Sequence, residues 1–146
     1  MREIKFRGVS VRDGDWYYGD LVQSNNKYYI YCSKKPDFDY YDYRETGHLM
    51  EEVITETVGQ FTGLEDVNGT KIYEGDILDC SNAWWSAAGP AGHDSPIIVV
   101  KWQDDLTGYN PFANYDCDCG VYISSDECKV IGNIYENEEL LSKGGK

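Results

Sequence analysis

The sequence has no long hydrophobic run and no secretion signal. Its longest uninterrupted apolar run is five residues, Tyr28 to Cys32, whereas a membrane-spanning helix needs about 20. The N-terminus reads MREIKFRGV and lacks the apolar stretch of a signal peptide. We therefore expect a cytoplasmic protein that does not contact a membrane.

Positive charge is also scarce. The chain has 13 Lys and Arg residues against 26 Asp and Glu residues, and residues 51–146 contain the whole net charge of −13. Nucleic-acid binding depends on Lys and Arg contacts to phosphates, so this composition disfavours it. Acidity of this kind keeps a small domain soluble. The alternative is an acidic face that imitates nucleic acid or docks a basic partner.

The cysteine content argues against a disulfide framework. Five cysteines, an odd number, occur without a secretion signal, which favours reduced thiols. The strongest metal candidate combines Cys117, Cys119 and Cys128 with His93 or Cys80. Its C-x-C spacing differs from the C-x₂₋₄-C pairs of structural zinc sites. We expect no metal ion and no cofactor.

Catalytic signatures are missing as well. The two histidines, His48 and His93, both fall in expected loops with no recognisable motif around them, although a nucleophilic thiol needs a neighbouring base. The sequence contains neither a Walker motif nor a G-x-G-x-x-G fingerprint. We therefore predict that the protein is not an enzyme.

What the sequence does contain is a series of short β-strand patterns. Residues 3–9, 16–22 and 27–32 are rich in aromatic and β-branched residues and are separated by Asp-Gly-Asp and Ser-Asn-Asn turns. This pattern predicts a three-stranded meander. Residues 49–57 could form a short helical turn or an irregular connector.

The central stretch, residues 58–78, predicts further strands. Val58 to Phe61 is extended and a turn is expected at Thr62-Gly63. The pair Asn68-Gly69 suits a two-residue type I′ hairpin. Strands are expected at Thr70–Tyr73 and Asp76–Leu78, with a bulge or bend at Glu74-Gly75.

The last third predicts three strands and a helix. Residues 96–102 form the best strand pattern in the sequence, and the unbroken apolar run within them indicates a strand covered on both faces. Residues 121–123 and 128–135 are expected strands. Residues 136–141 suit a short terminal helix, because acids in a first turn favour the positive end of the helix dipole.

Three blocks of the chain carry a family resemblance. The core block runs from Gly59 to Leu64, includes Asp66 and Asn68-Gly69, and ends with Ile72 to Ile77. The other two blocks are the N-terminal Arg2 to Arg7 and the C-terminal Val130 to Asn137 with Leu140. Together they resemble the YopX family of phage and prophage proteins. The resemblance implies a small, mostly β, phage-encoded protein in a bacterial host. The biochemical role of the family is unknown.

Two segments outside these blocks are candidate partner-binding surfaces. Trp84 and Trp85 lie in a Gly- and Pro-punctuated segment, and Trp is enriched at binding hot spots. Tyr40, Tyr41 and Tyr43 alternate with aspartates, and Tyr gives a large contact area at low entropic cost. The alternative for the tyrosine segment is that its rings lie over the edge of the core. The alternative for the tryptophans is that at least one of them folds back as a lid over the end of the barrel.

We therefore predict a mainly β fold. It consists of one or two small bent β-barrel-like (SH3-like) subdomains with a few short helical turns and a short C-terminal helix. Residues 1–146 form a single domain, with a possible subdivision near residues 50–60. The expected function is a non-enzymatic accessory protein that binds an unknown host or phage protein. The alternatives are an acidic nucleic-acid-mimicking inhibitor and a nucleic-acid-binding small β-barrel. A homo-oligomer is compatible with exposed strand edges.

Overall fold

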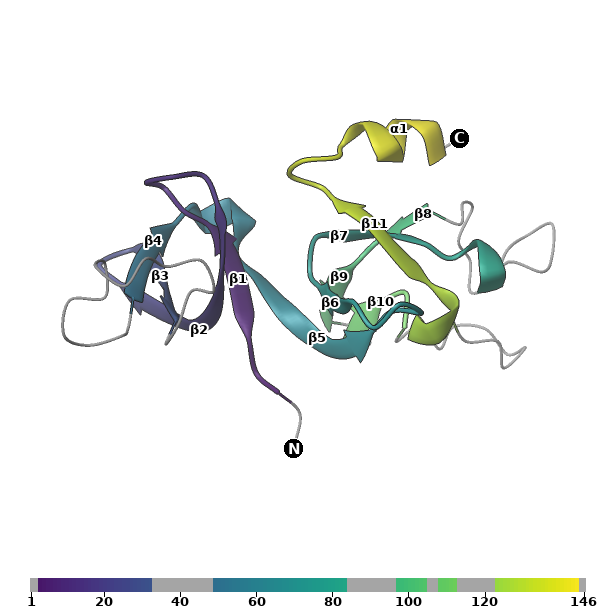
Figure 1. Ribbon diagram of the computed structural model, residues 1–146, viewed down its shortest axis with the longest axis horizontal. Helices are drawn as coiled ribbons and strands as arrows, with labels where there is room; N and C mark the ends of the chain where they lie inside the picture. Colours follow the sequence, from purple (N-terminus) through teal and green to yellow (C-terminus); the bar gives the residue numbers. More distant parts are fainter. Residues whose placement is uncertain (1–2, 33–48, 84–96, 105–107, 113–122, 145–146) are drawn as a thin grey trace. The chain divides into compact units, whose positions relative to one another are not determined.

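The computed structural model describes residues 3–32, 49–83, 97–104, 108–112 and 123–144. The chain divides into two compact units, Met1–Phe61 (unit 1) and Thr62–Lys146 (unit 2). Both units are built mainly from short antiparallel strands (Figure 1), so the predicted mainly β fold is confirmed.

Unit 1 is a curled antiparallel sheet. Its elements are β1 (Phe6–Val9), β2 (Trp16–Ser24), β3 (Lys27–Cys32), β4 (Leu49–Val53), the 3₁₀ helix η2 (Thr55–Thr57) and the start of β5 (Gly59–Glu65). The strands lie in the order β4-β3-β2-β1-β5, with β6 of unit 2 next to β5. The predicted meander of the first three strands is confirmed.

The curl of this sheet comes from a change of partner along β2. Residues Trp16 to Gly19 pair with β1, whereas Asp20 to Ser24 pair with β3. Gly19 lies at the change, where the carbonyl group of Tyr31 occupies the space that a Cβ atom would need. At the far end of β1, an isolated bridge joins Ser10 to Val53 at the end of β4. The sheet is therefore barrel-like, although its main ladder remains open.

Strand β4 was missed by the sequence prediction of a helical turn or connector over residues 49–57. The segment forms a strand followed by the helical turn η2. Its sequence, LMEEV, lacks the usual alternation because Glu51 is buried and Met50 is exposed. A buried carboxylate here takes a position that a hydrophobic residue normally occupies.

A two-residue hairpin turn does occur in unit 1, between β2 and β3. Asn25 and Asn26 both have positive φ, 52° and 62°, and Ser24 pairs with Lys27 across the turn. These are the dihedral signs of a type I′ turn. The core that the strands enclose contains Tyr17, Ile30, Cys32 and Val53, with Phe6, Leu21, Tyr28 and Val58 packed against it.

Unit 2 contains two smaller sheets and the terminal helix. Its elements are β6 (Lys71–Tyr73), β7 (Asp76–Asp79), η3 (Ser81–Ala83), β8 (Ile97–Val99), β9 (Lys101–Gln103), β10 (Gly108–Asn110), η6 (Ser125–Glu127), β11 (Lys129–Asn133) and α1 (Glu139–Gly144). One sheet has the order β11-β7-β8 and the other pairs β9 with β10. The terminal helix was predicted three residues too early.

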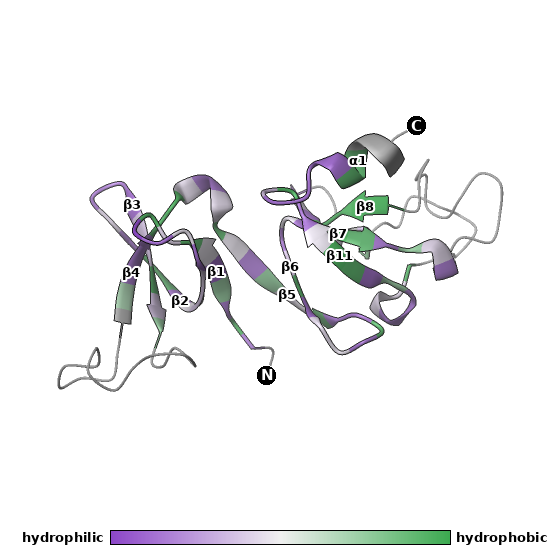
Figure 2. Ribbon diagram, turned by 45° about the horizontal axis from the view of Figure 1, so that its top comes forward, coloured by the Kyte–Doolittle hydropathy of each residue, from purple (hydrophilic) through white to green (hydrophobic). Residues whose placement is uncertain are grey.

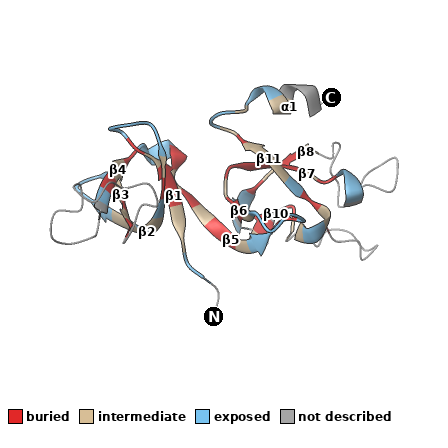
Figure 3. Cartoon of the chain, viewed as in Figure 1, coloured by how far each residue is buried: buried red, intermediate tan, exposed pale blue. Residues whose placement is uncertain are grey.

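Hydrophobic residues gather on β7, β8 and β11 (Figure 2). Strand β7 is buried along most of its length, whereas β11 is mainly half-buried (Figure 3). The core consists of Ile72, Leu78, Cys80, Ile98, Val100, Tyr109, Ile123 and Cys128, with Phe112 and Val130 packed against it. Each unit thus encloses a hydrophobic cluster of its own.

Two strand predictions in this half were wrong in detail. The expected strand 96–102 is split at Val100, whose backbone hydrogen-bonds Gly75 and Asp76 at the start of β7. Ile97 and Val99 are only half-buried, so the strand is not covered on both faces. The expected turn at Thr62-Gly63 lies inside β5, where Gly63 has a φ of +88°.

The turn predicted at Asn68-Gly69 is also different. Among the residues described, Gly69 has positive φ but Asn68 does not, which rules out the type I′ geometry. The loop is longer, because the Asp66 N–H donates to the Thr70 carbonyl. The bend predicted at Glu74-Gly75 is confirmed, with Gly75 at a φ of +89°.

Within the described part of the chain, no helix has the length and apolar character that crossing a membrane requires.

Candidate functional site

The residues predicted to bind a partner lie outside the described ranges. Trp84 and Trp85 belong to residues 84–96, and Tyr40, Tyr41 and Tyr43 belong to residues 33–48. Their role therefore stays a prediction. The attachment of the tyrosine segment is described, however. It leaves β3 after Cys32 and re-enters β4 at Leu49, and these two residues face each other as a strand pair.

Beside this strand pair lies an open recess of about 270 Å³ in unit 1. It is lined by Glu3, Ile4 and Lys5 before β1, Tyr18, Gly19 and Asp20 of β2, and Tyr31 and Cys32 of β3. The recess forms where β2 changes partner. Among the described residues that line it, the charged groups are two carboxylates and one ammonium group, and Lys5 lies 4.0 Å from Glu3.

The size of the recess limits what it can hold. Pockets for small-molecule ligands usually measure about 300–1,000 Å³, so this recess suits one or two side chains of a larger partner. Tyr18 is 42% exposed. A tyrosine face and two carboxylates attract a cationic side chain, through cation–π contact and charge. No sequence pattern pointed to this site, because its three segments meet only in the fold.

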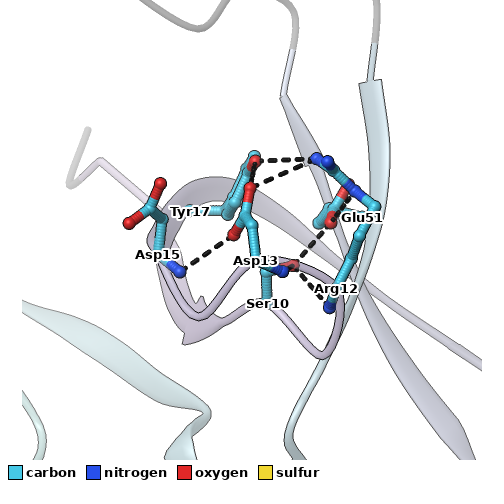
Figure 4. A network of polar contacts seen from close by, with 6 residues as sticks. All are labelled: Ser10, Arg12, Asp13, Asp15, Tyr17 and Glu51. Carbon is cyan, nitrogen blue, oxygen red and sulfur yellow. Dashed lines mark hydrogen bonds and ion pairs between the residues drawn. The ribbon is translucent and has the colours of Figure 1, made fainter.

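A second polar constellation surrounds the turn between β1 and β2 (Figure 4). Glu51 of β4 accepts hydrogen bonds at Oε1 from the Ser10 hydroxyl at 2.5 Å and from Arg12 Nε at 3.0 Å. Asp13 Oδ2 accepts from the Tyr17 hydroxyl at 2.6 Å, and the Arg12 guanidinium contacts both. The network joins residues that are 41 positions apart in the sequence.

The electrostatics of this network are those of a charged pair that braces a turn. The hydrogen bond from Tyr17, assisted by the backbone N–H of Asp15, lowers the pKa of Asp13. The hydrogen bond to Glu51 raises the pKa of Arg12, and the charge of Glu51 adds to this effect. The carboxylates of Asp13 and Glu51 thus both accept hydrogen bonds from within the network.

Ser10 illustrates why the network does not resemble a catalytic site. Its hydroxyl donates to Glu51 and accepts from the backbone N–H groups of Arg12 and Asp13. The residue is 1% exposed. A nucleophile needs a free lone pair directed at a substrate, and here both lone pairs accept hydrogen bonds. The arrangement fixes the turn to β4.

We expect Glu51→Gln to destabilise unit 1 by about 2 kcal/mol, because a buried charge-assisted acceptor is lost. Glu52→Gln is the matched control, since Glu52 is the next residue, is half-buried and pairs with Lys27. That control should cost less than about 1 kcal/mol. Chemical denaturation of both variants measures the difference, and equal losses would contradict a bracing role for Glu51.

In unit 2, Asp66 ties a loop to a distant strand. Its Oδ1 accepts from the N–H groups of Asn68 at 2.9 Å and Thr70 at 2.8 Å, and its Oδ2 accepts from Val130 N–H at 2.9 Å. Asp66 is 6% exposed. Burial raises the pKa of Asp66, but the three backbone donors together lower it by more. The pKa of Asp66 is therefore below its usual value.

Two other side chains close turns in the same way. Asp76 Oδ2 accepts from Tyr73 N–H at 2.8 Å, across the bend at Gly75. Asn133 Oδ1 accepts from the N–H groups of Tyr135 and Glu136, both at 3.0 Å. Side chains that bond nearby backbone groups in this way stabilise turns.

A family model described as "YopX protein" matches residues 5–142 of the chain. The chain belongs to the YopX family. The match covers nearly the whole sequence, including both units. The resemblance inferred from the three sequence blocks is therefore confirmed.

The YopX signature coincides with these turn braces. Three residues of the blocks that carry the resemblance accept hydrogen bonds from backbone N–H groups: Asp66, Asp76 and Asn133. Gly132 belongs to the same set, since a Cβ there would lie 2.5 Å from Asn137 Oδ1. In this YopX protein these residues of the signature therefore brace turns of unit 2.

A solved structure supports the same fold. The crystal structure of protein EF1440 from Enterococcus faecalis is similar with a TM-score of 0.50 and 21% sequence identity, over 97% of this chain and 99% of that one. At this identity the similarity concerns the fold alone. A comparison with curated proteins finds none that matches.

The described residues of this YopX protein offer no group of three or more His, Cys, Asp and Glu side chains that could hold a metal ion. Of the predicted metal candidates, Cys80 and Cys128 are described and lie side by side. Cys117, Cys119 and His93 lie outside the described ranges.

Proposed function

We propose that this YopX protein is a non-enzymatic, phage- or prophage-encoded accessory protein that acts by binding another protein in the bacterial cytoplasm. The observation that carries the proposal is the tyrosine-lined recess of unit 1, beside the strand pair that anchors residues 33–48. The side chains of the other polar clusters that we describe form hydrogen bonds that stabilise turns.

The chemistry of the recess favours a partner with an exposed basic side chain. Glu3 and Asp20 supply two carboxylates against one lysine, beside the ring of Tyr18. The whole chain carries a net charge of −13, which would accelerate the association with a basic partner and make it dependent on salt. Tyr40, Tyr41 and Tyr43 are proposed to extend this surface, with Trp84 and Trp85 as a further contact.

A site-specific cross-link tests the proposal. A photoreactive benzoylphenylalanine in place of Tyr18 should give a discrete protein adduct when the chain is expressed in its host and illuminated. The same group in place of Val11, which is 56% exposed and outside the recess, is the matched control and should give none. Equal labelling from both positions, or none from either, would contradict binding at the recess.

The identified partner then allows a quantitative test of charge. We expect Asp20→Lys to weaken binding at least about tenfold, because it reverses a charge inside the recess. Glu56→Lys makes the same change on the exposed turn η2 and should change affinity less than about twofold. Equal effects would mean that net charge, rather than the recess, determines binding.

The acidic mimic remains the second candidate, because residues 51–146 contain the whole net charge. Among the described residues, three carboxylates of that region are inaccessible to a partner, since Glu51 is 5% exposed, Asp66 6% and Asp76 2%. A mimic would bind a nucleic-acid-handling protein in competition with nucleic acid, and Asp20→Lys would have little effect. If the protein is instead a nucleic-acid-binding barrel, the cross-linked adduct would contain nucleic acid and nuclease treatment would remove it.

A further inference from the structure

Two buried thiols of unit 2 lie directly opposite each other. Cys80 follows the last residue of β7, and Cys128 precedes the first residue of β11. The antiparallel register pairs Asp79 with Lys129, so the two cysteines occupy the next opposing positions. Both are 0% exposed, and their Sγ atoms are 2.6 Å apart.

This position meets the requirements of a cross-strand disulfide. Opposed residues on antiparallel strands have Cα atoms about 4.5–5.5 Å apart, within the roughly 4.4–6.8 Å that a disulfide spans. Two thiolates on one tetrahedral zinc ion, each about 2.3 Å from the metal, would be roughly 3.8 Å apart. The observed separation is shorter than such a site requires.

We propose that Cys80 and Cys128 are an oxidisable dithiol whose disulfide joins β7 to β11. The oxidant is a low-molecular-weight disulfide such as glutathione disulfide. The thiolate of Cys80 attacks one of its sulfurs and releases the first glutathione thiolate. Cys128 then loses its proton and attacks the Cys80 sulfur of this mixed disulfide. The second glutathione thiolate leaves, so the oxidant has taken up both electrons and both protons.

The surroundings of the pair make this reaction slow in the folded chain. The hydrogen bond with Cys128, burial, and the negative charges of Asp79 and Glu127 all raise the pKa of the Cys80 thiol. Cys128 also contacts the Ser124 carbonyl oxygen at 3.5 Å. Since the attacking species is the thiolate, exchange requires an opening of the β7–β11 edge.

The bond would close a large loop. The two cysteines are separated by 48 positions, which include β8, β9 and β10. Loop closure of this length makes a disulfide on the order of 10³-fold more stable in the folded chain than in the unfolded chain. We therefore expect the melting temperature of the oxidised protein to be about 10 °C above that of the reduced protein.

The test uses the full chain in glutathione redox buffers, followed by alkylation and peptide mapping by mass spectrometry. The expected result is a Cys80–Cys128 linked peptide whose formation is accelerated by low concentrations of denaturant, together with the rise in melting temperature. Cys32→Ser, at a buried thiol of unit 1, should leave the formation of the Cys80–Cys128 linked peptide unchanged. Cys128→Ser should abolish both the linked peptide and the rise in melting temperature. If that variant does not fold, the peptide map of the wild-type protein still tests the proposal.

Three results would overturn the proposal. The first is full alkylation of Cys80 and Cys128 at every redox ratio. The second is a dominant linkage of either cysteine to Cys117 or Cys119. The third is stoichiometric zinc in the purified protein that a chelator removes together with the protection of the two thiols.

Discussion

Replacing Gly19 with alanine should unfold unit 1 under conditions where the parent chain is folded. A Cβ at this position would overlap the carbonyl oxygen of Tyr31 and lie 2.9 Å from its carbonyl carbon. Both are backbone atoms of β3, so no rotamer change can relieve the overlap. Such overpacking costs about 3 kcal/mol or more, because the β2–β3 pairing has to shift.

Hydrogen exchange measured on individual peptides shows where the chain loses stability. Peptides from β2 and β3 should lose their protection, whereas peptides from β7 and β11 keep theirs, since unit 2 has its own core. Gly14→Ala is the matched control. Its φ is +76° and no atom lies within 4 Å of the position that a Cβ would take, so only the dihedral cost of about 1–2 kcal/mol applies. Similar losses in both variants would contradict the close approach of the Tyr31 carbonyl group to Gly19.

The second large effect is expected for Asp66→Asn. The amide retains one oxygen for Asn68 and Thr70, but its NH₂ group would face the donor Val130 N–H. One charge-assisted hydrogen bond is lost and two donors are opposed, which should cost about 3 kcal/mol at pH 7. Chemical denaturation measures the loss. Glu65→Gln, at the exposed neighbouring position, should be nearly neutral.

The loss should depend on pH in a defined direction. The pKa of Asp66 is lower in the folded chain than its usual value, so its ionised form is stabilised by folding. That contribution is complete above the unfolded pKa of about 3.9 and disappears as pH falls through the folded value. The difference between wild type and Asp66→Asn should therefore shrink between about pH 5 and the onset of acid unfolding. A difference that is constant with pH would contradict the role of the Asp66 charge.

Local pattern was sufficient to predict much of unit 1. The aromatic and β-branched runs at residues 16–22 and 27–32 predicted β2 and β3, and the β3 bounds are those observed. Strand β4 was missed because Glu51 is buried by a network that involves Arg12, 39 positions away. Periodicity cannot detect a polar residue whose partners are distant in the sequence.

The errors in unit 2 have the same origin. The Asn68-Gly69 turn was predicted from two residues, whereas its geometry depends on Asp66, which is itself held by Val130. The split at Val100 depends on its backbone bonds to Gly75 and Asp76. In each case the deciding contact joins segments that are 24 or more positions apart, as the numbering of these residues shows.

The candidate site was the least accessible to sequence reasoning. The partner-binding prediction rested on Trp84, Trp85 and the Tyr40–Tyr43 segment, which lie outside the described residues. The recess depends on three segments that the curled sheet brings together. Its tyrosines, Tyr18 and Tyr31, were interpreted as ordinary strand residues, because nothing in a strand pattern distinguishes a ring that lines a recess.

Strand β5 has a practical consequence for dissecting this protein. The division between the units falls after Phe61, inside the strand, and there is no linker at that point. Dividing the chain there would separate the Thr62 hydroxyl group, which donates to the Ile72 carbonyl, from the first residues of β5 in one half. In the other half it would shorten the strand that pairs with β1. Expression fragments should therefore overlap, with residues 1–65 for one and 59–146 for the other. Each would then carry its own copy of the shared strand.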